Sequence, residues 1–594
     1  MASASSAQPF VVSSGSDRPA VPSLWTTAAV PFSVRVRKES TVSWKSQDVD
    51  VSVDLTQNSI TFRKRGKDTV LGVIPGSDLV QVIPRDDALN LNIVFRVGDR
   101  QSTISMRVPE EEPLVRDILS SLMLLLFADH SYVGHYEVQP DGTKVRVPDE
   151  SELSVFVGTW NVGNSAPPGD LSPWLQPGVH DVYAVGAQEC DFRGWTDSLT
   201  SCFGEDYTLI ANHSLMQMKL HLFVRNKLVP RVSLVATTRE ATGLLRVVGN
   251  KGGLGIFLRI DSTPMVFVSA HFAAHQGKVE IRNKDYSEIL EGLQFNRPVL
   301  DIMSECHRSF WCGDLNYRID APMEEVIAAV ESQEFDHLLE ADQLIKEQRA
   351  GRVFDGWETQ PPSFPPTYKY ETEKGNTFEK PQRTYTLKKS RVPSWCDRIL
   401  WRDATEENAI ECVSYTCCDS IRTSDHSPVA AAFRVKTVLP YIHSIPRYIL
   451  PEHPELCDEE GPYRFRITSF RGEDLMPADP NGLSDPYVVF HGDIIKGCGV
   501  MRTNIEKKTL NPVFANKNVP PLEIVPRSYA LIKRRYLIFR VMDWDRLSSN
   551  DYLGSTILDF GLFEVNVPRE FTVPVYYYGV RKGFLHGVGV LETV

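Results

Sequence analysis

Short apolar runs that end on polar residues recur through the middle of this sequence. Val266 to Ala270 and Phe310 to Cys312 have the length and composition of buried β-strands. His271 directly follows the first run, and Asp314 and Asn316 follow the second. Because side chains alternate along a strand, we expect the carboxylate of Asp314 and the amide of Asn316 to point the same way. The pattern predicts a sheet edge where a base and a hydrogen-bond donor face one atom.

Two earlier runs follow the same rule. Residues 154–157 lead to Asn161, and residues 181–185 lead to Glu189. An amide oxygen and a carboxylate at neighbouring strand ends form a hard-oxygen site that suits Mg²⁺. The sequence contains no group of His and Cys residues with the spacing of a zinc site.

A later polar cluster, residues 423–428, places the carboxylate of Asp425 beside the imidazole of His426. Each short motif by itself is more often an ordinary turn, and this holds for Gly313 to Asn316 as well. Several such clusters in one chain are what indicate a catalytic site.

Strand-like pieces separated by turns also fill residues 33–108. A Leu-rich segment without helix breakers follows from Pro109 to Ala128, and it opens with proline and acidic residues as helices do. Strands followed by one helix resemble a pleckstrin-homology (PH)-like domain. The basic hairpin 63–67 lies where such domains bind inositol phosphates, and a solvated basic turn is the alternative interpretation.

A set of motifs between residues 150 and 436 closely resembles the inositol polyphosphate 5-phosphatases of the endonuclease/exonuclease/phosphatase superfamily. The Trp-Asn, Gln-Glu and Ser-Asp-His motifs suit any member of the superfamily, nucleases and sphingomyelinases included. The Gly-Asp-Leu-Asn-Tyr-Arg, Pro-Pro-Thr-Tyr-Lys-Tyr and Pro-Ser-Trp-Cys-Asp-Arg motifs are the discriminating ones. In chain order the motifs are Thr159-Trp-Asn161, Gln188-Glu189, Gly249-Asn-Lys-Gly-Gly253, Ser269-Ala-His-Phe-Ala-Ala-His275, Trp311-Cys-Gly-Asp-Leu-Asn-Tyr-Arg318, Phe364-Pro-Pro-Thr-Tyr-Lys-Tyr370, Pro393-Ser-Trp-Cys-Asp-Arg-Ile-Leu400 and Ser424-Asp-His-Ser-Pro428.

This resemblance implies an α+β fold whose catalytic part is a four-layer αββα sandwich. It also implies Mg²⁺-dependent hydrolysis of a phosphomonoester by direct in-line attack of water. Asn161 and Glu189 would hold the Mg²⁺, which neutralises charge on phosphoryl oxygens. The family forms no covalent phosphoenzyme, so no cysteine is expected to act as a nucleophile.

The resemblance also assigns the catalytic side chains. Asp314 would orient and deprotonate the water, and Asn316 would hydrogen-bond the pentavalent centre. His426, oriented by a carboxylate neighbour, and His271 would each bind a phosphoryl oxygen. Asp425 would belong either to the histidine network or to the outer shell of the metal.

Specificity requires cations and donors for the other phosphates on the inositol ring. By resemblance, Asn250 and Lys251 match contacts to the 1-phosphate. The residues that match contacts to the 4-phosphate are Tyr368, Lys369, Lys389 and Arg391. The apolar segment 215–222, and the segment after His271, lie where lipid-using relatives place membrane loops, although Met-rich residues fit a core equally well. Arg398 is the remaining predicted substrate-binding residue.

The last part of the chain strongly resembles a C2 domain, an eight-stranded β-sandwich. Several aspartates match the calcium-ligand positions of C2 domains, and carboxylates that converge on one tip repel each other unless a cation is present. Bound Ca²⁺ would let that tip meet anionic lipid. The alternative is a C2 domain that keeps these aspartates but does not bind Ca²⁺. The matching residues are Asp479, Asp485, Asp543, Asp545 and Asp551.

Composition narrows the class of protein. The residues are 42% hydrophobic and 24% charged, as in soluble globular proteins. A chain of 594 residues is too long for a single hydrophobic core and is therefore expected to form several domains. A net charge of −12 argues against a nucleic-acid binder. Ten cysteines without CxxC pairing indicate a reducing compartment, and adjacent Cys417 and Cys418 are interpreted as buried thiols. No secretory signal or membrane span is recognisable.

Together these features predict a cytoplasmic phosphoinositide 5-phosphatase recruited peripherally to anionic membranes. The expected substrates are phosphatidylinositol 4,5-bisphosphate and 3,4,5-trisphosphate, with soluble inositol polyphosphates also open. The alternative is a calcium-regulated membrane adaptor with a dormant phosphatase fold. The predicted organisation is a disordered segment at 1–20, a PH-like β-barrel at 21–135, the catalytic domain at 150–436, a Pro-rich linker at 437–459 and the C2 domain at 460–594.

Overall fold

The computed structural model describes most of the chain from residue 150 onward and parts of the region before it. The described residues are 32–38, 46–54, 57–84, 90–97, 100–109, 115, 119, 122–123, 137–138, 144–145, 150–243, 251–261, 263–295, 301–372, 383–386, 391–405, 408–438, 462–492, 494–496, 499–524, 529–533, 535–546 and 549–594. The predicted disordered segment, most of the predicted linker and most of the predicted helix at 109–128 lie outside these residues.

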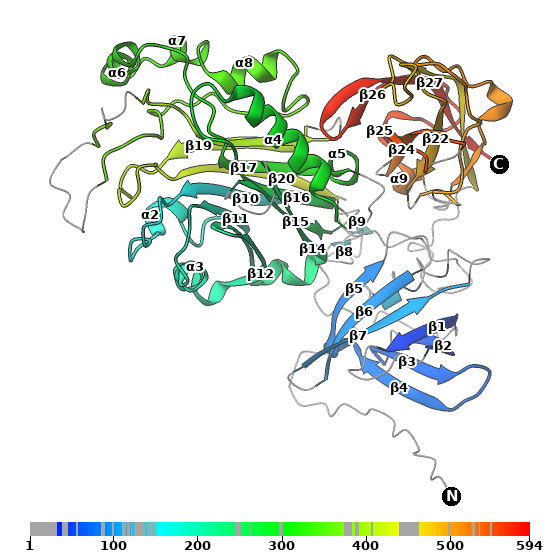
Figure 1. The fold of residues 1–594 in the computed structure, drawn as a ribbon. Coiled ribbons are helices and arrows are strands. Elements are labelled where there is room, and N and C mark those ends of the chain that lie inside the picture. Colours follow the sequence, from blue (N-terminus) through cyan, green and yellow to red (C-terminus); the bar gives the residue numbers. More distant parts are fainter. Residues whose placement is uncertain are drawn as a thin grey trace, which may run out of the picture.

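Two sheets form the centre of the molecule (Figure 1). The first has the order β12 (Tyr207–Leu215), β13 (Met218–Arg225), β11 (Val182–Gln188), β10 (Glu150–Asn161), β20 (Val429–Val438) and β19 (Ile410–Cys417). The second has the order β14 (Val232–Ala241), β15 (Gly252–Ile260), β16 (Thr263–His271), β17 (Arg308–Asp314) and β18 (Asp397–Asp403). The strands predicted from the apolar runs are therefore confirmed.

Alternation along the strands builds the core between these sheets. Val155 and Val157 of β10 point inward and share a hydrophobic cluster with Phe267 of β16 and Phe310 of β17. Phe156, which lies between the two valines, belongs instead to the cluster on the outer face. Apolar side chains on both faces explain why these strands read as continuous apolar runs.

Helices cover both outer faces, so the predicted αββα layering is confirmed (Figure 1). The first sheet is covered by α2 (Ser172–Leu175) and α3 (Trp195–Phe203). The second is covered by α4 (Val279–Gly292), α5 (Ile302–Glu305) and α8 (Gln343–Arg349). Two further helices, α6 (Met323–Ser332) and α7 (Asp336–Leu339), contribute Val326 and Leu338 to the core between the sheets.

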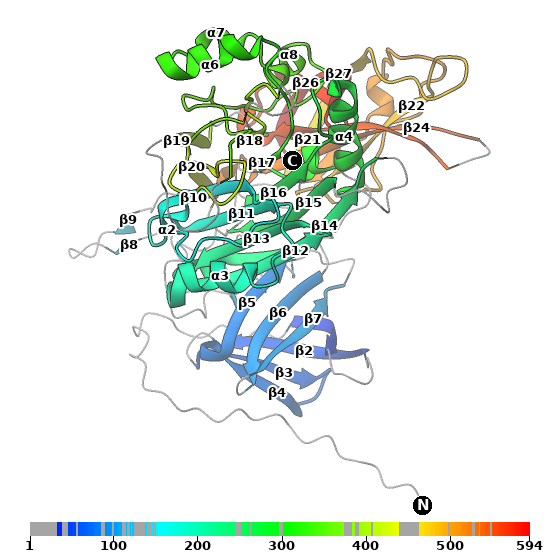
Figure 2. The same ribbon diagram turned by 60° about the vertical axis from the view of Figure 1, so that its left-hand side comes forward.

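The N-terminal region contains a seven-stranded antiparallel sheet whose strand β5 lies against β14 (Figure 2). In the predicted basic hairpin, Arg65 is 3.6 Å from the carboxylate of Asp48. The order is β4 (Val70–Pro75), β3 (Ser59–Lys64), β2 (Ser46–Asp54), β1 (Phe32–Lys38), β7 (Arg100–Arg107), β6 (Asn90–Val97) and β5 (Leu79–Pro84). A two-stranded sheet, β8 (Glu137–Val138) and β9 (Lys144–Val145), precedes the sandwich.

The C-terminal region forms a second seven-stranded sheet that curls around its own hydrophobic core. Eight strands were predicted, and seven are found among the described residues. A short helix, α9 (Tyr529–Ile532), accompanies them. The order is β22 (Pro486–His491), β24 (Tyr536–Asp543), β25 (Tyr552–Asp559), β26 (Arg569–Tyr577), β27 (Val580–Thr593), β21 (Tyr463–Glu473) and β23 (Leu522–Ile524).

Asp301, at the start of α5, connects the C-terminal sheet to the sandwich. Its carboxylate accepts hydrogen bonds from the hydroxyl of Tyr552 at 3.0 Å and the backbone N–H of Tyr578 at 3.2 Å. Burial raises the pKa of Asp301 to about 6. Tyr576 packs in the same apolar cluster as Trp311 of β17. The C-terminal sheet is therefore attached to the outer face of the second sheet, on the side of α5.

Within the described part of the chain, we find no helix with the length and apolar character needed to cross a membrane.

Candidate active site

The polar strand ends of the two sheets meet at one edge of the sandwich. Asn161 pairs with Gln188 across β10 and β11, which are parallel. In the second sheet His271 pairs with Asp314, and Asp314 pairs with Asp397. The side-chain amide of Asn161 donates a 2.9 Å hydrogen bond to Oδ2 of Asp314, which joins the two sheets. The strand registers therefore bring these groups together.

Asp314 lies at the centre of this edge and is buried. Nε2 of His271 lies 3.3 Å from its Oδ2, and the ammonium of Lys251 contacts the same ring nitrogen. Burial alone raises the pKa of Asp314, but the His271 hydrogen bond and the charges of His426 and Lys251 outweigh it and hold that pKa below its usual range. Burial and the Lys251 charge lower the pKa of His271. The site therefore pairs an ionised carboxylate with a neutral imidazole.

The predicted magnesium ligands lie next to this pair. Oε1 of Glu189 is 4.0 Å from Nε2 of His271, and the Glu189 side chain is 33% exposed. Oδ1 of Asn161 accepts a 3.0 Å hydrogen bond from the N–H of Gly163, which uses one of its two lone pairs. Carboxylate and amide oxygens beside Asp314, without a thiolate, are a donor set that fits Mg²⁺.

A second imidazole, His426, is fixed by a carboxylate that the sequence did not single out. Nδ1 of His426 lies 2.8 Å from Oδ2 of Asp397, and the hydroxyl of Thr367 donates to the same oxygen at 2.6 Å. Burial lowers the pKa of His426, but the negative charges of Asp397, Asp314 and Asp425 overcome this and raise it to about 9. His426 is therefore a cation at neutral pH.

Asn316 does not continue the strand as predicted. Its φ of 55° is left-handed, so the alternation of side chains that the prediction assumed ends at Asp314. Its amide nitrogen donates to the carbonyl of Phe272 at 3.1 Å, and its amide oxygen accepts from Arg318. The described contacts use one of the two amide hydrogens, which leaves the other for a ligand.

Cationic side chains gather around Tyr368, whose ring centroid lies 4.5 Å from that of His426. The guanidinium of Arg391 donates to the Tyr368 hydroxyl. Nζ of Lys369 lies 5.3 Å from the Tyr368 ring centroid and pairs with the carboxylate of Asp425. Asp397 is the hydrogen-bond partner of the imidazole, so Asp425 takes part in the histidine network only through its charge, which raises the pKa of His426.

Two family models match parts of this chain. Residues 158–432 match the family model described as Endonuclease/Exonuclease/phosphatase family 2, and residues 463–574 match that of the C2 domain. Residues 158–432 are an endonuclease/exonuclease/phosphatase family 2 domain. The C-terminal sheet is a C2 domain.

Curated proteins similar to this chain are named as phosphatases of a phosphoinositide lipid. The zebrafish (Danio rerio) phosphatidylinositol 3,4,5-trisphosphate 5-phosphatase 2B is 32% identical over 411 residues, which cover 65% of this chain and 32% of that protein. The human phosphatidylinositol 3,4,5-trisphosphate 5-phosphatase 2 is 37% identical over 317 residues, covering 50% of this chain and 25% of that protein. The chain thus spans about a third or less of the length of the curated relatives it matches.

Among solved structures, the family 2 domain is similar to the inositol polyphosphate 5-phosphatase domain of SPsynaptojanin, in complex with inositol (1,4)-bisphosphate and a calcium ion. The identity is 28%, the TM-score is 0.44, and the match covers 52% of this chain and 90% of that one.

The structure leaves two of the predicted substrate-binding residues untested and places a third away from the site. Asn250 and Lys389 lie outside the described residues. Arg398 of the family 2 domain is fully buried, and its guanidinium is 3.1 Å from the carboxylate of Asp342. A buried charge needs such a partner, so Arg398 links β18 to the start of α8 and has no access to a substrate.

In segment 215–222 the core interpretation is confirmed for three residues, and contact with lipid stays a prediction for the turn. Met218, Leu220 and Leu222 are buried in the core between the sheets. Met216, at the turn between β12 and β13, is 50% exposed, and nearby Phe192 is 38% exposed. Only the turn is therefore available for contact with a lipid.

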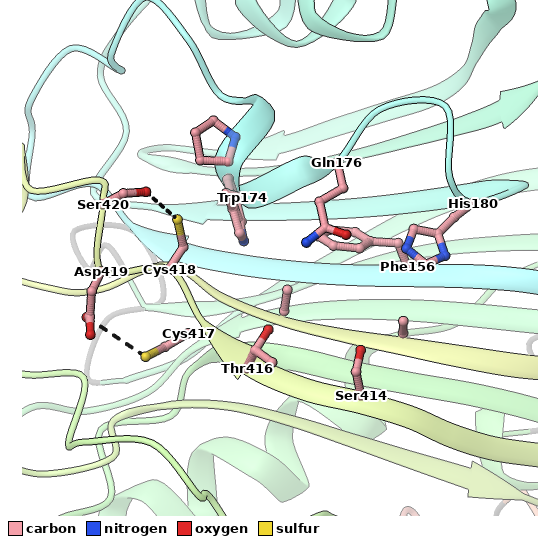
Figure 3. A pocket seen from close by; sticks show the side chains of 13 residues that line it. Phe156, Trp174, Gln176, His180, Ser414, Thr416, Cys417, Cys418, Asp419 and Ser420 are labelled. Atoms are coloured by element: carbon pink, nitrogen blue, oxygen red, sulfur yellow. Dashed lines mark hydrogen bonds between the residues drawn. The ribbon is translucent and has the colours of Figure 1, made fainter.

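A hollow of about 380 Å³ lies on the outer face of the first sheet (Figure 3). Ala430 and Ala432 leave space on this face between Trp174 of α2 and the edge strand β19. No Lys or Arg is among its lining residues, so it does not suit a phosphate. Cys417 and Cys418 lie at its edge as free, half-buried thiols that pack on opposite faces of the sheet, which corrects the prediction that both are buried.

At the tip of the C2 domain, three predicted calcium ligands converge. One carboxylate oxygen from each of Asp479, Asp543 and Asp545 lies within 4.8 Å of the others. Burial and the charges of Asp479, Asp545 and Asp485 raise the pKa of Asp543, as expected of carboxylates that repel each other. Asp485 accepts a 2.7 Å hydrogen bond from the N–H of Lys508. Asp551, which is outside this group, contributes its carbonyl oxygen to the N–H of Asp543 at 2.8 Å.

Besides Asp397, Arg318 is a residue near Asp314 that the sequence analysis did not identify. It is buried, donates to both the carbonyl and the side chain of Asn316, and lies 4.5 Å from the Tyr368 ring centroid. The Gly-Asp-Leu-Asn-Tyr-Arg motif contains it, and so the motif itself was the available signal.

Proposed function

We propose that the chain is a phosphoinositide 5-phosphatase. The observation that carries the proposal is one ionised carboxylate, Asp314, with two imidazoles beside it and the cations Lys251, Lys369 and Arg391 around it. A phosphate monoester on a polyphosphorylated ring needs a base for water and cations for its remaining charges. The curated relatives carry the name phosphatidylinositol 3,4,5-trisphosphate 5-phosphatase, which supports the same substrate class.

In the proposed reaction Asp314 orients a water molecule and takes its proton while the water oxygen bonds to the 5-phosphorus. The bond between phosphorus and the inositol oxygen breaks, and that oxygen leaves and takes a proton from water to become the ring hydroxyl. The cationic His426 donates to a phosphoryl oxygen, where negative charge develops, and the free amide hydrogen of Asn316 donates to the same centre, while the neutral ring of His271 keeps its one N–H on Asp314. Arg318 holds the Asn316 amide in place for this contact. Mg²⁺ held by Asn161 and Glu189 would supply further charge neutralisation at the phosphate.

Phosphate release tests this function. Vesicles carrying phosphatidylinositol 3,4,5-trisphosphate or 4,5-bisphosphate, and the matching soluble inositol phosphates, are assayed after EDTA treatment and after Mg²⁺ is restored. We expect release from the lipids that depends on Mg²⁺. No release from any 5-phosphorylated substrate would contradict the proposal and favour a membrane adaptor, and nicking of a plasmid would indicate a nuclease.

Arg391→Ala is expected to raise KM for a substrate that carries a 4-phosphate by about 10- to 100-fold, because one charge-assisted hydrogen bond is lost. Arg391→Lys should recover only part of this loss, since an ammonium lacks the planar fork. Steady-state kinetics on substrates with and without a 4-phosphate measure the effect. Arg349→Ala, which removes an exposed arginine paired with Glu340, is the matched control. A change in KM, relative to wild type, that is the same for both substrates in Arg391→Ala would refute the assignment.

We also propose that the C2 domain binds Ca²⁺ and then an anionic membrane, which would concentrate the enzyme on its lipid substrate. The supporting observation is the group of Asp479, Asp543 and Asp545 and the raised pKa of Asp543. We further propose the boundaries 21–135, 150–436 and 460–594 for the PH-like, catalytic and C2 units.

Asp543→Asn is expected to weaken calcium-dependent sedimentation with phosphatidylserine vesicles by about tenfold or more, since the site loses one charged ligand. It should also abolish the rise in melting temperature that Ca²⁺ causes in the wild type. Glu523→Gln, on an exposed strand residue paired with Lys496, is the control. Equal sedimentation of the wild-type protein with vesicles in the presence and absence of Ca²⁺ would overturn the calcium proposal.

A further inference from the structure

The loop Ser424–Ser427 carries both Asp425 and His426, and its backbone is held by the strands around it. The hydroxyl of Ser424 donates to the carbonyl of Asn161 at 2.7 Å. The indole N–H of Trp160 donates to the carbonyl of His426 at 3.2 Å. These contacts tie the loop to the end of β10, the strand that also ends in a predicted metal ligand.

Arg383 holds the opposite side of this loop. It belongs to the short described stretch 383–386, which no motif singled out. One guanidinium nitrogen donates to the hydroxyl of Ser427 at 2.7 Å, and the other donates to the carbonyl of Ser424 at 2.6 Å. The two acceptors lie on either side of Asp425 and His426, so a single planar group spans the catalytic segment.

The position of Arg383 is itself fixed. Its guanidinium lies 4.0 Å from the ring centroid of Tyr370, whose backbone N–H donates to the carbonyl of Asp425 at 2.9 Å. The hydroxyl of Tyr370 is 2.9 Å from that of Tyr385, two residues after Arg383. The stacked tyrosines therefore anchor the segment from which the arginine reaches the loop.

We propose that Arg383 is a positioning residue that holds the Ser424–Ser427 loop so that His426 stays in line with Asp397 and the phosphoryl site. The proposal rests on the proposed phosphatase function. Arg383 contacts neither Asp397 nor the reacting groups in the described structure and acts through the loop. A lysine cannot replace it, because a single ammonium does not span two acceptors in the fixed geometry of a fork.

Arg383→Ala is expected to lower kcat about 100-fold with little change in KM, because a small displacement of a catalytic group has effects of this size. Methylguanidinium added to this variant should restore part of kcat, since it fits the space left by the side chain. Arg383→Lys should remain impaired. Ser427→Ala, which removes one of the two acceptors, should show a smaller loss.

Arg422→Ala is the matched control, since it removes an arginine of the neighbouring turn whose described side-chain bond goes to the carbonyl of Asp419 at 3.2 Å. It should keep wild-type kcat and gain nothing from methylguanidinium. Wild-type kcat in Arg383→Ala, or a folded Arg383→Ala variant that methylguanidinium does not restore, would overturn the proposal. If Arg383→Ala does not fold, wild-type kcat in both Arg383→Lys and Ser427→Ala overturns it.

An NMR signal separates this proposal from the proposed function. The proton between Nδ1 of His426 and Asp397 should give a downfield resonance in the wild type that is weakened in Arg383→Lys and unchanged in Arg422→Ala. A wild type without phosphatase activity contradicts the proposed function alone. An unchanged resonance in folded Arg383→Lys contradicts the positioning role, whatever the activity.

Discussion

Asp314→Asn is expected to reduce kcat by about 100- to 10,000-fold, the range that general-base catalysis supplies. Asparagine keeps the size of the side chain and one oxygen acceptor, so the fold should persist. The neutral amide oxygen of asparagine is too weakly basic to take a proton from water. Because the pKa of Asp314 is held below its usual range, the carboxylate is ionised throughout the physiological pH range, and the loss should be the same at every pH tested.

Single-turnover phosphate release and thermal melting measure this prediction. Glu331→Gln, an exposed residue of α6, serves as the control for removing one acid. If Asp314→Asn keeps activity within about threefold of wild type, another group must activate the water.

Asp397→Asn is the second large effect that we expect, with kcat at neutral pH falling about 10- to 100-fold. The charge of Asp397 is the main influence that raises the pKa of His426 to about 9 against the effect of burial. A group with a raised pKa is protonated below that value, so the wild type should lose activity as pH rises through about 9. Without the carboxylate the pKa of His426 falls, and the alkaline limb should move to lower pH.

The pH dependence of kcat/KM for wild type and Asp397→Asn measures this shift. Asp403→Asn is not a suitable control, because Asp403 forms a buried contact with Arg308 at 2.7 Å. Asp336→Asn, at the exposed start of α7, is suitable. An unchanged alkaline limb in Asp397→Asn would show that His426 is not the titrating group.

Much of the fold was predictable because apolar periodicity reflects burial directly. The runs before His271 and Asp314 are strands buried on both faces, as their composition indicated. The rule that polar residues follow strand ends also located Asn161 and Glu189 at the same edge. Asn316 broke the alternation, because one left-handed residue after a strand redirects the next side chain.

Sequence reasoning was weaker for side chains whose partners come from distant segments. Asp397 follows no apolar run, and its proximity to His426 depends on how β18 pairs with β17. Arg398 is next to it in a discriminating motif, yet it points to Asp342 because neighbouring strand residues face opposite sides. Arg383 carries no local signal, since its acceptors lie about forty residues further along the chain.

The sequence by itself determined which segments are strands, which polar residues follow them and the family to which residues 158–432 belong, because these depend on local composition and motif order. Only the tertiary structure decided the ionisation of Asp314 and His426, the partner of each carboxylate and the hold of Arg383 on its loop. Those properties arise from charges and donors brought within a few ångströms by strand register, and distance along the chain does not encode them.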